Sequence, residues 1–213
     1  MRNALRWGVA VAVMTVMAPA VASAENLYAA IRGGPGWTQD SLDGSFGFED
    51  TTQYKTGFTG GAALGYVLPF GFRAEGEFGF LYIPVKTEGG VGESGSIKNY
   101  LLMANGYYDL KLAALGPFKP YVGFGLGVAR VNIMQDIFRE SVNHNVHVNT
   151  PRTSFAYQAR AGIAYEINRS WDVSAGYRYV HIDSGQYQRF GVDVGNVGAL
   201  NNHSLELGVA FKF

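Results

Sequence analysis

Three absences narrow the class of this protein. The 213-residue sequence has no cysteine, which excludes a disulfide framework, thiolate catalysis and cysteine metal ligands. Its 17 basic residues are balanced by 17 acidic ones, and no basic stretch indicates a nucleic-acid partner. Beyond residue 24, no apolar run approaches the roughly twenty residues that a transmembrane helix needs.

The first 24 residues have the pattern of a secretory signal peptide. Arg2 and Arg6 form a basic start, residues 9–21 are apolar, and Ala22-Ser23-Ala24 is a small-x-small cleavage site. Cleavage before Glu25 leaves residues 25–213, one domain by length, with a net charge of −2. A secreted, cysteine-free chain rich in glycine and aromatic residues leaves two main fold classes, a β-sandwich and an outer-membrane β-barrel.

The C-terminal segment 202–213 alternates strictly between two faces. One face carries His203, Leu205, Leu207, Val209, Phe211 and Phe213, and the other is polar or small. Such period-two alternation predicts a strand with one apolar face. The terminal aromatic residue suits the last strand of a membrane barrel, whose end lies in an aromatic girdle at the lipid–water interface.

Seven further segments have strand character and complete a set of eight. The predicted strands are 27–37, 54–68, 72–83, 97–112, 119–133, 153–167, 171–181 and 202–213. Pro84 is expected to end the third strand. The parity of 119–133 places Val122, Phe124, Leu126 and Val128 on one face, opposite Gly123, Gly125 and Gly127.

The connections between these strands alternate in length. The short turns are 69–71, 113–118 and 168–170, and the long polar loops are 38–53, 85–96, 134–152 and 182–201. Short periplasmic turns alternating with long extracellular loops are typical of outer-membrane barrels, whereas a Greek-key sandwich has no reason to alternate in this way. The sequence therefore predicts an all-β fold, an eight-stranded antiparallel up-and-down transmembrane β-barrel.

The two faces of the strands differ in charge. The apolar faces carry no charge, and aromatic residues cluster at both ends of the strands, as in the two girdles of a membrane barrel. The opposite faces carry charges and many glycines, which suit a cramped lumen. The residues predicted to form an ion-pair network in that lumen are Arg73, Glu75, Glu77, Arg160, Arg178, Glu206 and Lys212.

Two interpretations of these charges remain open. Because buried charges must be paired, the first is an ion-pair plug, with Glu75 or Glu77, Arg160, Arg178 and Glu206 at one height. The second is a narrow, gated path for ions along the same charges. A carrier for hydrophobic ligands would need an apolar lumen, whereas the predicted lumen is charged.

Several short strings resemble a known family. They are Tyr107-Tyr108-Asp109, the string P-Y-V-G-F-G-L-G at 120–127, A-G-Y-R-Y at 175–179, and G-V-A-F-K-F at 208–213. They resemble the eight-stranded outer-membrane β-barrel proteins of the Omp25/Omp31 and opacity-protein type, related in architecture to the OmpA barrel. The resemblance implies a surface-exposed protein with structural, adhesive or antigenic roles and no defined ligand.

The expected function follows from fold and resemblance together. We expect a structural or surface-interaction protein of the Gram-negative outer membrane, without enzymatic activity or cofactor. The alternative is a narrow, low-conductance porin. Expected partners are outer-membrane lipids, ligands on host or neighbouring cells reached through the extracellular loops, and the barrel-assembly machinery, for which Phe211 and Phe213 resemble the assembly signal.

Two histidine-containing segments are candidates for other chemistry. His181, Asp183 and Ser184 suggest a lipid-modifying enzyme of the lipid A deacylase type, but residues three apart on a strand point to opposite faces, which disfavours a triad. His144 and His147 could hold a metal ion, yet two histidines without a nearby carboxylate or cysteine are a weak signal, and the sequence leaves this open.

The alternating loop lengths predict the topology. A thiol reagent applied to intact cells should label a single cysteine introduced in any of the four long loops. It should not label one at Gly71 or Asn168, which lie in turns predicted to face the periplasm. Labelling at the turns and not at the loops would invert this topology.

Overall fold

The computed structural model describes residues 26–39, 53–54, 56–86, 94–110, 113–139, 144–189, 192–197 and 199–213. The predicted signal peptide, residues 1–24, lies outside the described residues. Within the described ranges, no helix is both long enough and apolar enough to cross a membrane.

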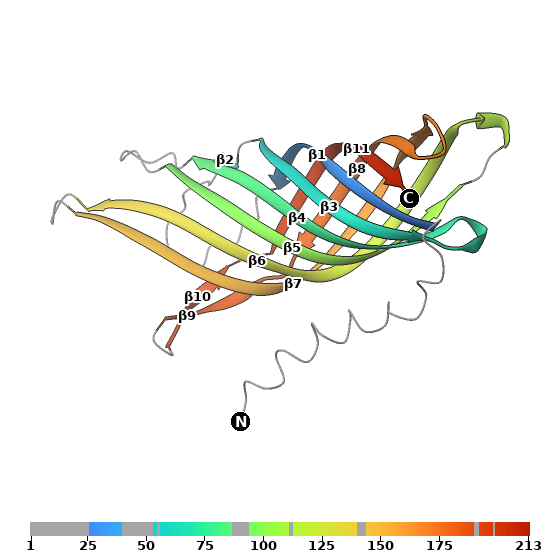
Figure 1. The fold of residues 1–213 in the computed structure, drawn as a ribbon. Coiled ribbons are helices and arrows are strands. Elements are labelled where there is room, and N and C mark those ends of the chain that lie inside the picture. Colours follow the sequence, from blue (N-terminus) through green and yellow to red (C-terminus); the bar gives the residue numbers. More distant parts are fainter. Residues whose placement is uncertain are drawn as a thin grey trace, which may run out of the picture.

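Eight long antiparallel strands build a single closed sheet (Figure 1). They are β1 (Leu27–Gln39), β3 (Gly57–Val67), β4 (Phe72–Lys86), β5 (Ser94–Asp109), β6 (Phe118–Arg139), β7 (His144–Glu166), β8 (Trp171–Ile182) and β11 (Leu200–Lys212). Each long strand pairs with its neighbour along the chain, and β1 pairs with β11 to close the ring. The predicted eight-stranded up-and-down barrel is confirmed. Closure matters because it leaves no sheet edge unpaired in the membrane.

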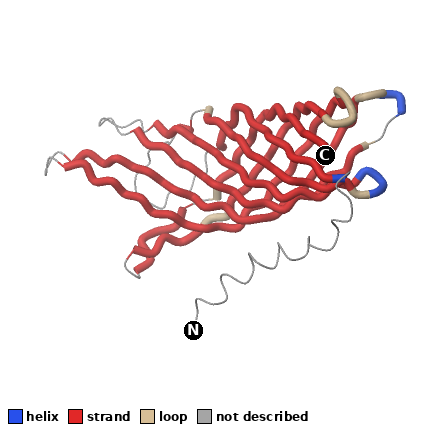
Figure 2. Tube along the Cα trace, viewed as in Figure 1, coloured by secondary structure: helices blue, strands red, loops and turns tan. Residues whose placement is uncertain are grey.

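Three short strands are added at one end of the barrel. They are β2 (Gln53–Tyr54), which pairs with β4, and the hairpin of β9 (Gly185–Arg189) with β10 (Val192–Val197). The tube in Figure 2 shows that the barrel strands themselves run far towards this end, which is opposite the end with the short turns.

The short turns have local causes. In the 3₁₀ turn Pro69–Gly71, Gly71 has a φ of 88° and Phe70 a φ of 63°. Glycine adopts positive φ without steric cost, as the sequence predicts for this turn. At the β7–β8 turn, Asn168 Oδ1 accepts hydrogen bonds from the backbone N–H groups of Ser170 and Trp171, both at 2.9 Å. The β5–β6 connection contains a second 3₁₀ turn, Ala113–Leu115.

The strands alternate between a lipid-facing and a lumen-facing side. Leu207 is 71% exposed on the outside of the isolated barrel, whereas Leu101 in the lumen is 1% exposed. The predicted parity of 119–133 is confirmed, since Val122, Phe124, Leu126 and Val128 are all exposed and Gly125 is buried. The exposed apolar band is the surface that lipid would cover.

Aromatic rings meet at both ends of this outer surface. Near the short turns, Phe118 packs against Tyr165 and Trp171 against Phe211, each pair with centroids 4.9 Å apart. Towards the other end, Phe80 and Tyr100 lie 5.5 Å apart. These contacts span neighbouring strands, as expected for the two predicted girdles.

The predicted loop boundaries are wrong at the end with long connections. Residues 134–139 and 144–152 continue the β6–β7 ladder, and 185–189 with 192–197 form the β9–β10 hairpin. β4 also continues past Pro84 to Lys86, because Pro84 stays opposite Ser96 of β5. On its other side, β4 pairs with β3 only as far as Tyr82 and with β2 from Val85, so Pro84 lies at the break between the two ladders, where a missing N–H is tolerated.

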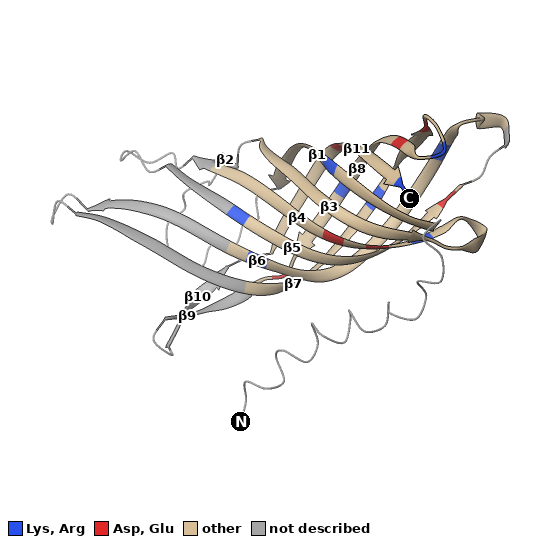
Figure 3. Ribbon diagram, viewed as in Figure 1, with Lys and Arg blue, Asp and Glu red and all other residues tan. Residues whose placement is uncertain are grey.

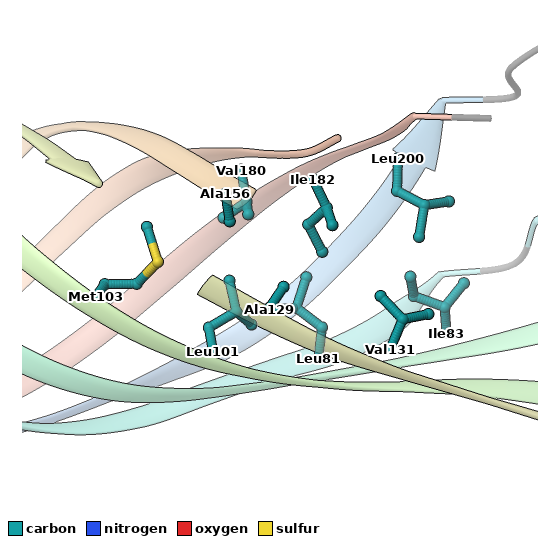
Figure 4. Packing of buried hydrophobic residues seen from close by; sticks show 10 residues of the cluster. All are labelled: Leu81, Ile83, Leu101, Met103, Ala129, Val131, Ala156, Val180, Ile182 and Leu200. Atoms are coloured by element: carbon teal, nitrogen blue, oxygen red, sulfur yellow. The ribbon is translucent and has the colours of Figure 1, made fainter. Parts of the chain in front are cut away.

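The described charged side chains occupy only part of the length of the lumen. Charged residues gather in the half near the short turns and the C-terminus (Figure 3). Towards the other end, the inward side chains form an apolar cluster of Leu81, Ile83, Leu101, Met103, Ala129, Val131, Ala156, Val180, Ile182 and Leu200 (Figure 4). Among the side chains that the structure describes, the expectation of a charged lumen is therefore wrong for this half. We call the cluster the apolar cap.

A lumen-facing glycine provides a test of the close packing. A Cβ at Gly123 would lie 2.2 Å from Cδ1 of the buried Tyr107. Gly123→Ala should therefore destabilise the barrel by about 1–3 kcal/mol through overpacking. The measurement is the temperature at which the folded band is lost in an unboiled SDS gel. Gly106→Ala is the matched control, since its Cβ would meet nothing within 4 Å, and an equal shift for both would contradict close packing at Gly123.

Candidate functional site

Four charged side chains meet in the middle of the lumen. Glu77 comes from β4, Arg160 from β7, Arg178 from β8 and Glu206 from β11, each at a lumen-facing position of its strand. Their exposed fractions are 2%, 5%, 0% and 6% respectively. We call these four residues the ion-pair layer.

The first half of the layer is a two-pronged contact. Arg160 donates to both carboxylate oxygens of Glu77, at 2.8 Å from Nη1 and 2.9 Å from Nη2. Its Nε donates to Glu206 Oε2 at 2.9 Å. Arg160 thus bridges carboxylates from two different strands, in the fork geometry that makes guanidinium–carboxylate pairs strong and directional.

The second half uses Arg178. Its Nη1 lies 3.2 Å from Glu206 Oε1, and its Nη2 lies 3.3 Å from Glu77 Oε1 without hydrogen-bond geometry. Its Nε donates to Gln158 Oε1 at 2.8 Å. Each arginine therefore contacts both carboxylates, and the two positive and two negative charges form a closed ring.

Neutral polar side chains complete the layer. Asn105 donates to Glu77 Oε2 at 2.8 Å, and Gln158 donates to Asn105 Oδ1 at 2.6 Å. The Tyr107 hydroxyl accepts a hydrogen bond from Arg160 Nη1 at 2.5 Å. Buried charges are tolerated when such partners satisfy the remaining donors and acceptors, so these amides and the phenol offset part of the cost of burying the layer.

A further buried carboxylate, that of Glu75, lies nearer the short turns than the ion-pair layer does. Glu75 accepts from Arg32 through both oxygens, each at 2.7 Å, and from the Tyr28 hydroxyl at 2.8 Å. The Tyr107 hydroxyl donates to Glu75 at 3.4 Å, which links this pair to the ion-pair layer. The lumen therefore holds successive levels of paired charge.

The remaining predicted lumen residues lie at the short-turn rim. Arg73 donates to Asp109 at 2.8 Å. Lys212 lies 2.7 Å from Asp172 Oδ2 and 3.9 Å from Glu166, which also pairs with Lys119. We call these contacts the rim pairs. Of the seven predicted residues, the structure brings four together in one layer and places Glu75, Arg73 and Lys212 nearer the rim.

Sequence reasoning missed Arg32 and the neutral partners. Arg32 shares its face with Tyr28 and Ala30, opposite the apolar Leu27, Ala29 and Ile31, so its inward position could have been found from alternation. Asn105, Tyr107 and Gln158 follow the parity of their strands as well. Their roles depend on which strands face each other across the lumen, and alternation alone does not predict which strands do so.

The histidine candidates are separated from this site. His181 faces outward. Its Nδ1 lies 2.7 Å from Asn201 Oδ1, its Nε2 lies 3.2 Å from Asp183, and its ring stacks on Tyr157. The backbone of His144 and His147 lies in β7, and their side chains are outside the described residues. Among the residues that the structure describes, no group of three or more potential ligands could hold a metal ion.

Comparisons with known proteins agree with the barrel. A family model described as outer membrane protein beta-barrel domain matches residues 8–213. A curated "Outer membrane protein" of Gluconacetobacter diazotrophicus is 29% identical over 155 residues, which are 68% of this chain and 41% of the relative. The chain thus spans about two fifths of that relative's length.

Two solved structures show the same fold. Neisserial surface protein A has a TM-score of 0.58 at 21% identity, covering 90% of this chain and 98% of that one. The outer membrane protein OprG from Pseudomonas aeruginosa has a TM-score of 0.57 at 14% identity, covering 89% of this chain and 97% of that one.

The ion-pair layer generates a stability prediction. Arg178→Ala should destabilise the barrel by about 3–5 kcal/mol, because it leaves Glu77 and Glu206 short of one positive partner. Urea unfolding in detergent micelles measures the loss. Arg130→Ala is the matched control, since Arg130 is exposed on the outside of β6.

The charge exchange Arg178→Glu with Glu206→Arg tests direct pairing. It should recover only part of the lost stability, because the carboxylate introduced at position 178 would face Glu77 and the guanidinium introduced at position 206 would face Arg160. An exchange that is no more stable than Arg178→Glu alone would show that the contact between these two side chains contributes nothing.

Proposed function

The chain belongs to the family of outer membrane protein β-barrel domains, and we propose that it serves as a structural and surface-interaction protein whose lumen is plugged by charged side chains. The protein resides in the outer membrane of a Gram-negative bacterium, with its apolar band in contact with lipid. In such barrels the short turns face the periplasm and the long connections face outward.

The ion-pair layer is the observation that carries the plug. Its residues come from β4, β7, β8 and β11, so the contacts cross the lumen and do not merely follow one wall. The interior of an eight-stranded barrel is just wide enough for side chains to fill. An ion on this path would have to displace guanidinium–carboxylate contacts that the low-dielectric interior strengthens.

The apolar cap supports the same proposal, because it lies in the part of the lumen on the far side of the ion-pair layer. Its ten side chains are at most 4% exposed and fill the lumen between the ion-pair layer and the extracellular end. Four buried polar side chains lie at the same heights, so the apolar cap narrows the path of an ion without removing every polar ligand from it; they are Thr59, Asn99, Ser154 and Asn202. The plug thus has two parts with different chemistry, and a solute that disrupts one still meets the other.

The surface role is supported by the long hairpins. β6 and β7 remain paired out to Arg139 and His144, and β9 with β10 forms a separate hairpin at the same end. Such ordered extensions offer a surface outside the membrane for ligands on host or neighbouring cells. At the opposite end, Phe211 packs on Trp171 and on Phe213, and this terminal aromatic group is the proposed signal for the barrel-assembly machinery.

Planar-bilayer recordings test the plug. The refolded wild-type protein should show no stepwise conductance, whereas Arg178→Ala, which breaks the ion-pair layer and removes support beneath the apolar cap, should open measurable steps. Arg130→Ala, on the outer surface, should remain silent. Regular conductance steps in the wild-type protein would overturn the plug and favour the narrow porin.

A further inference from the structure

A cavity of about 190 Å³ occupies the short-turn end of the lumen. It lies among the rim pairs, and its wall includes the turn before β4, the start of β8 and the end of β11, represented by Gly71, Asp172 and Lys212. We call it the rim cavity. It is separate from the ion-pair layer, none of whose four residues lines it.

The cationic and anionic side chains that line the cavity are unequal in number. Four cationic side chains line it, Arg32, Arg73, Lys119 and Lys212, against two carboxylates, Asp109 and Asp172. The partner of Arg32, Glu75, has a side chain with 0% exposure and is not part of the wall. Glu166, the partner of Lys119, is likewise outside the wall. With these partners included, the four cations are matched by four carboxylates, so the cavity is distinguished by the N–H donors in its wall and not by net charge.

Arg73 is held in place with donor capacity left over. Its guanidinium lies 5.0 Å from the ring centroid of Tyr107, 5.6 Å from that of Tyr121 and 5.7 Å from that of Tyr28. Nη2 donates to Asp109 at 2.8 Å and Nη1 to the Tyr28 hydroxyl at 3.4 Å, which leaves one further N–H on each terminal nitrogen, whereas Nε is buried out of reach of a ligand. Such cation–π contacts fix the orientation of a guanidinium, and a fixed donor loses little entropy on binding.

The two lysines add flexible donors at the mouth. Lys119 is 33% exposed and Lys212 is 25% exposed, so each ammonium reaches both the cavity and solvent. An ammonium has three donors, and the hydroxyl of Ser174 also lines the wall. Donors thus surround the cavity on several sides and do not form a single plane.

We propose that the rim cavity binds a phosphate-sized oxyanion, either free phosphate or the phosphomonoester of a small headgroup. A tetrahedral anion presents acceptor oxygens in several directions, which matches donors from β4, β6 and β11. A metal cation would find the nearby carboxylates already paired with cationic side chains, and a planar carboxylate would use fewer of the donors. The cavity has room for roughly a dozen water-sized spheres, so an anion of the size of phosphate fits with some of its hydration.

Isothermal titration calorimetry on the refolded full-length protein tests this site. Inorganic phosphate, titrated against chloride of equal ionic strength, should bind saturably, and glycerol 3-phosphate is titrated in parallel. Binding of inorganic phosphate alone identifies the free ion as the ligand, whereas equal or tighter binding of glycerol 3-phosphate identifies the headgroup. Saturable binding of neither overturns the proposal.

Three variants locate the binding. Arg73→Gln, Lys119→Gln and Lys212→Gln should each weaken binding by about tenfold or more, and Lys98→Gln, on the outer side of β5 at the opposite end, should leave it unchanged. Heat-modifiability in SDS gels shows whether each variant is folded. Should Arg73→Gln fail to fold, the two lysine variants decide, because their side chains are partly exposed. Wild-type affinity in both lysine variants would contradict a site in the rim cavity.

Discussion

The narrowness of the lumen is the constraint on which the rest of this structure depends. Eight strands enclose an interior that side chains fill, so every inward residue must either pack or find a polar partner. Arginine and glutamate satisfy this condition as a closed ring in the ion-pair layer, and leucine, isoleucine and valine satisfy it in the apolar cap. The glycines opposite Tyr28 and Tyr107 leave the space that those rings occupy.

The same constraint fixes strand register. A slip of one residue would turn every inward side chain towards lipid, which would place charges in the apolar band. The ion-pair layer links β4 to β7, β8 and β11, strands that are not all neighbours in the sheet. Backbone pairing sets the register only between adjacent strands. Contacts across the lumen also relate the registers of strands that are not adjacent, so they favour one pairing of the strands over its alternatives as well as stabilising the barrel.

Alternation along each strand was sufficient to predict the barrel, its short turns and the inward side of Glu77 or Arg178. Alternation did not predict how far the strands extend or which side chains meet across the lumen, because a pattern along one strand contains no information about the other strands. The β6–β7 extension is polar at many positions, yet backbone pairing between two long strands continues without an apolar face. The apolar cap follows the same parity as the charges, but Leu81 of β4 and Val180 of β8 belong to one cluster only because the closed sheet brings their strands round one axis. Arg32 was within reach of the same parity argument.

The levels of the lumen are coupled through one tyrosine. Tyr107 accepts from Arg160 in the ion-pair layer, donates to Glu75 and lies under the guanidinium of Arg73 at the rim. An anion placed beside Arg73 would weaken the contacts of that guanidinium with the ring and with Asp109, because the anion would compete with them for the same positive charge. The hydroxyl of Tyr107 is anchored on both sides, so such a change at the rim reaches the buried layer through a single side chain. Occupation of the proposed anion site would therefore act on the ion-pair layer through Tyr107.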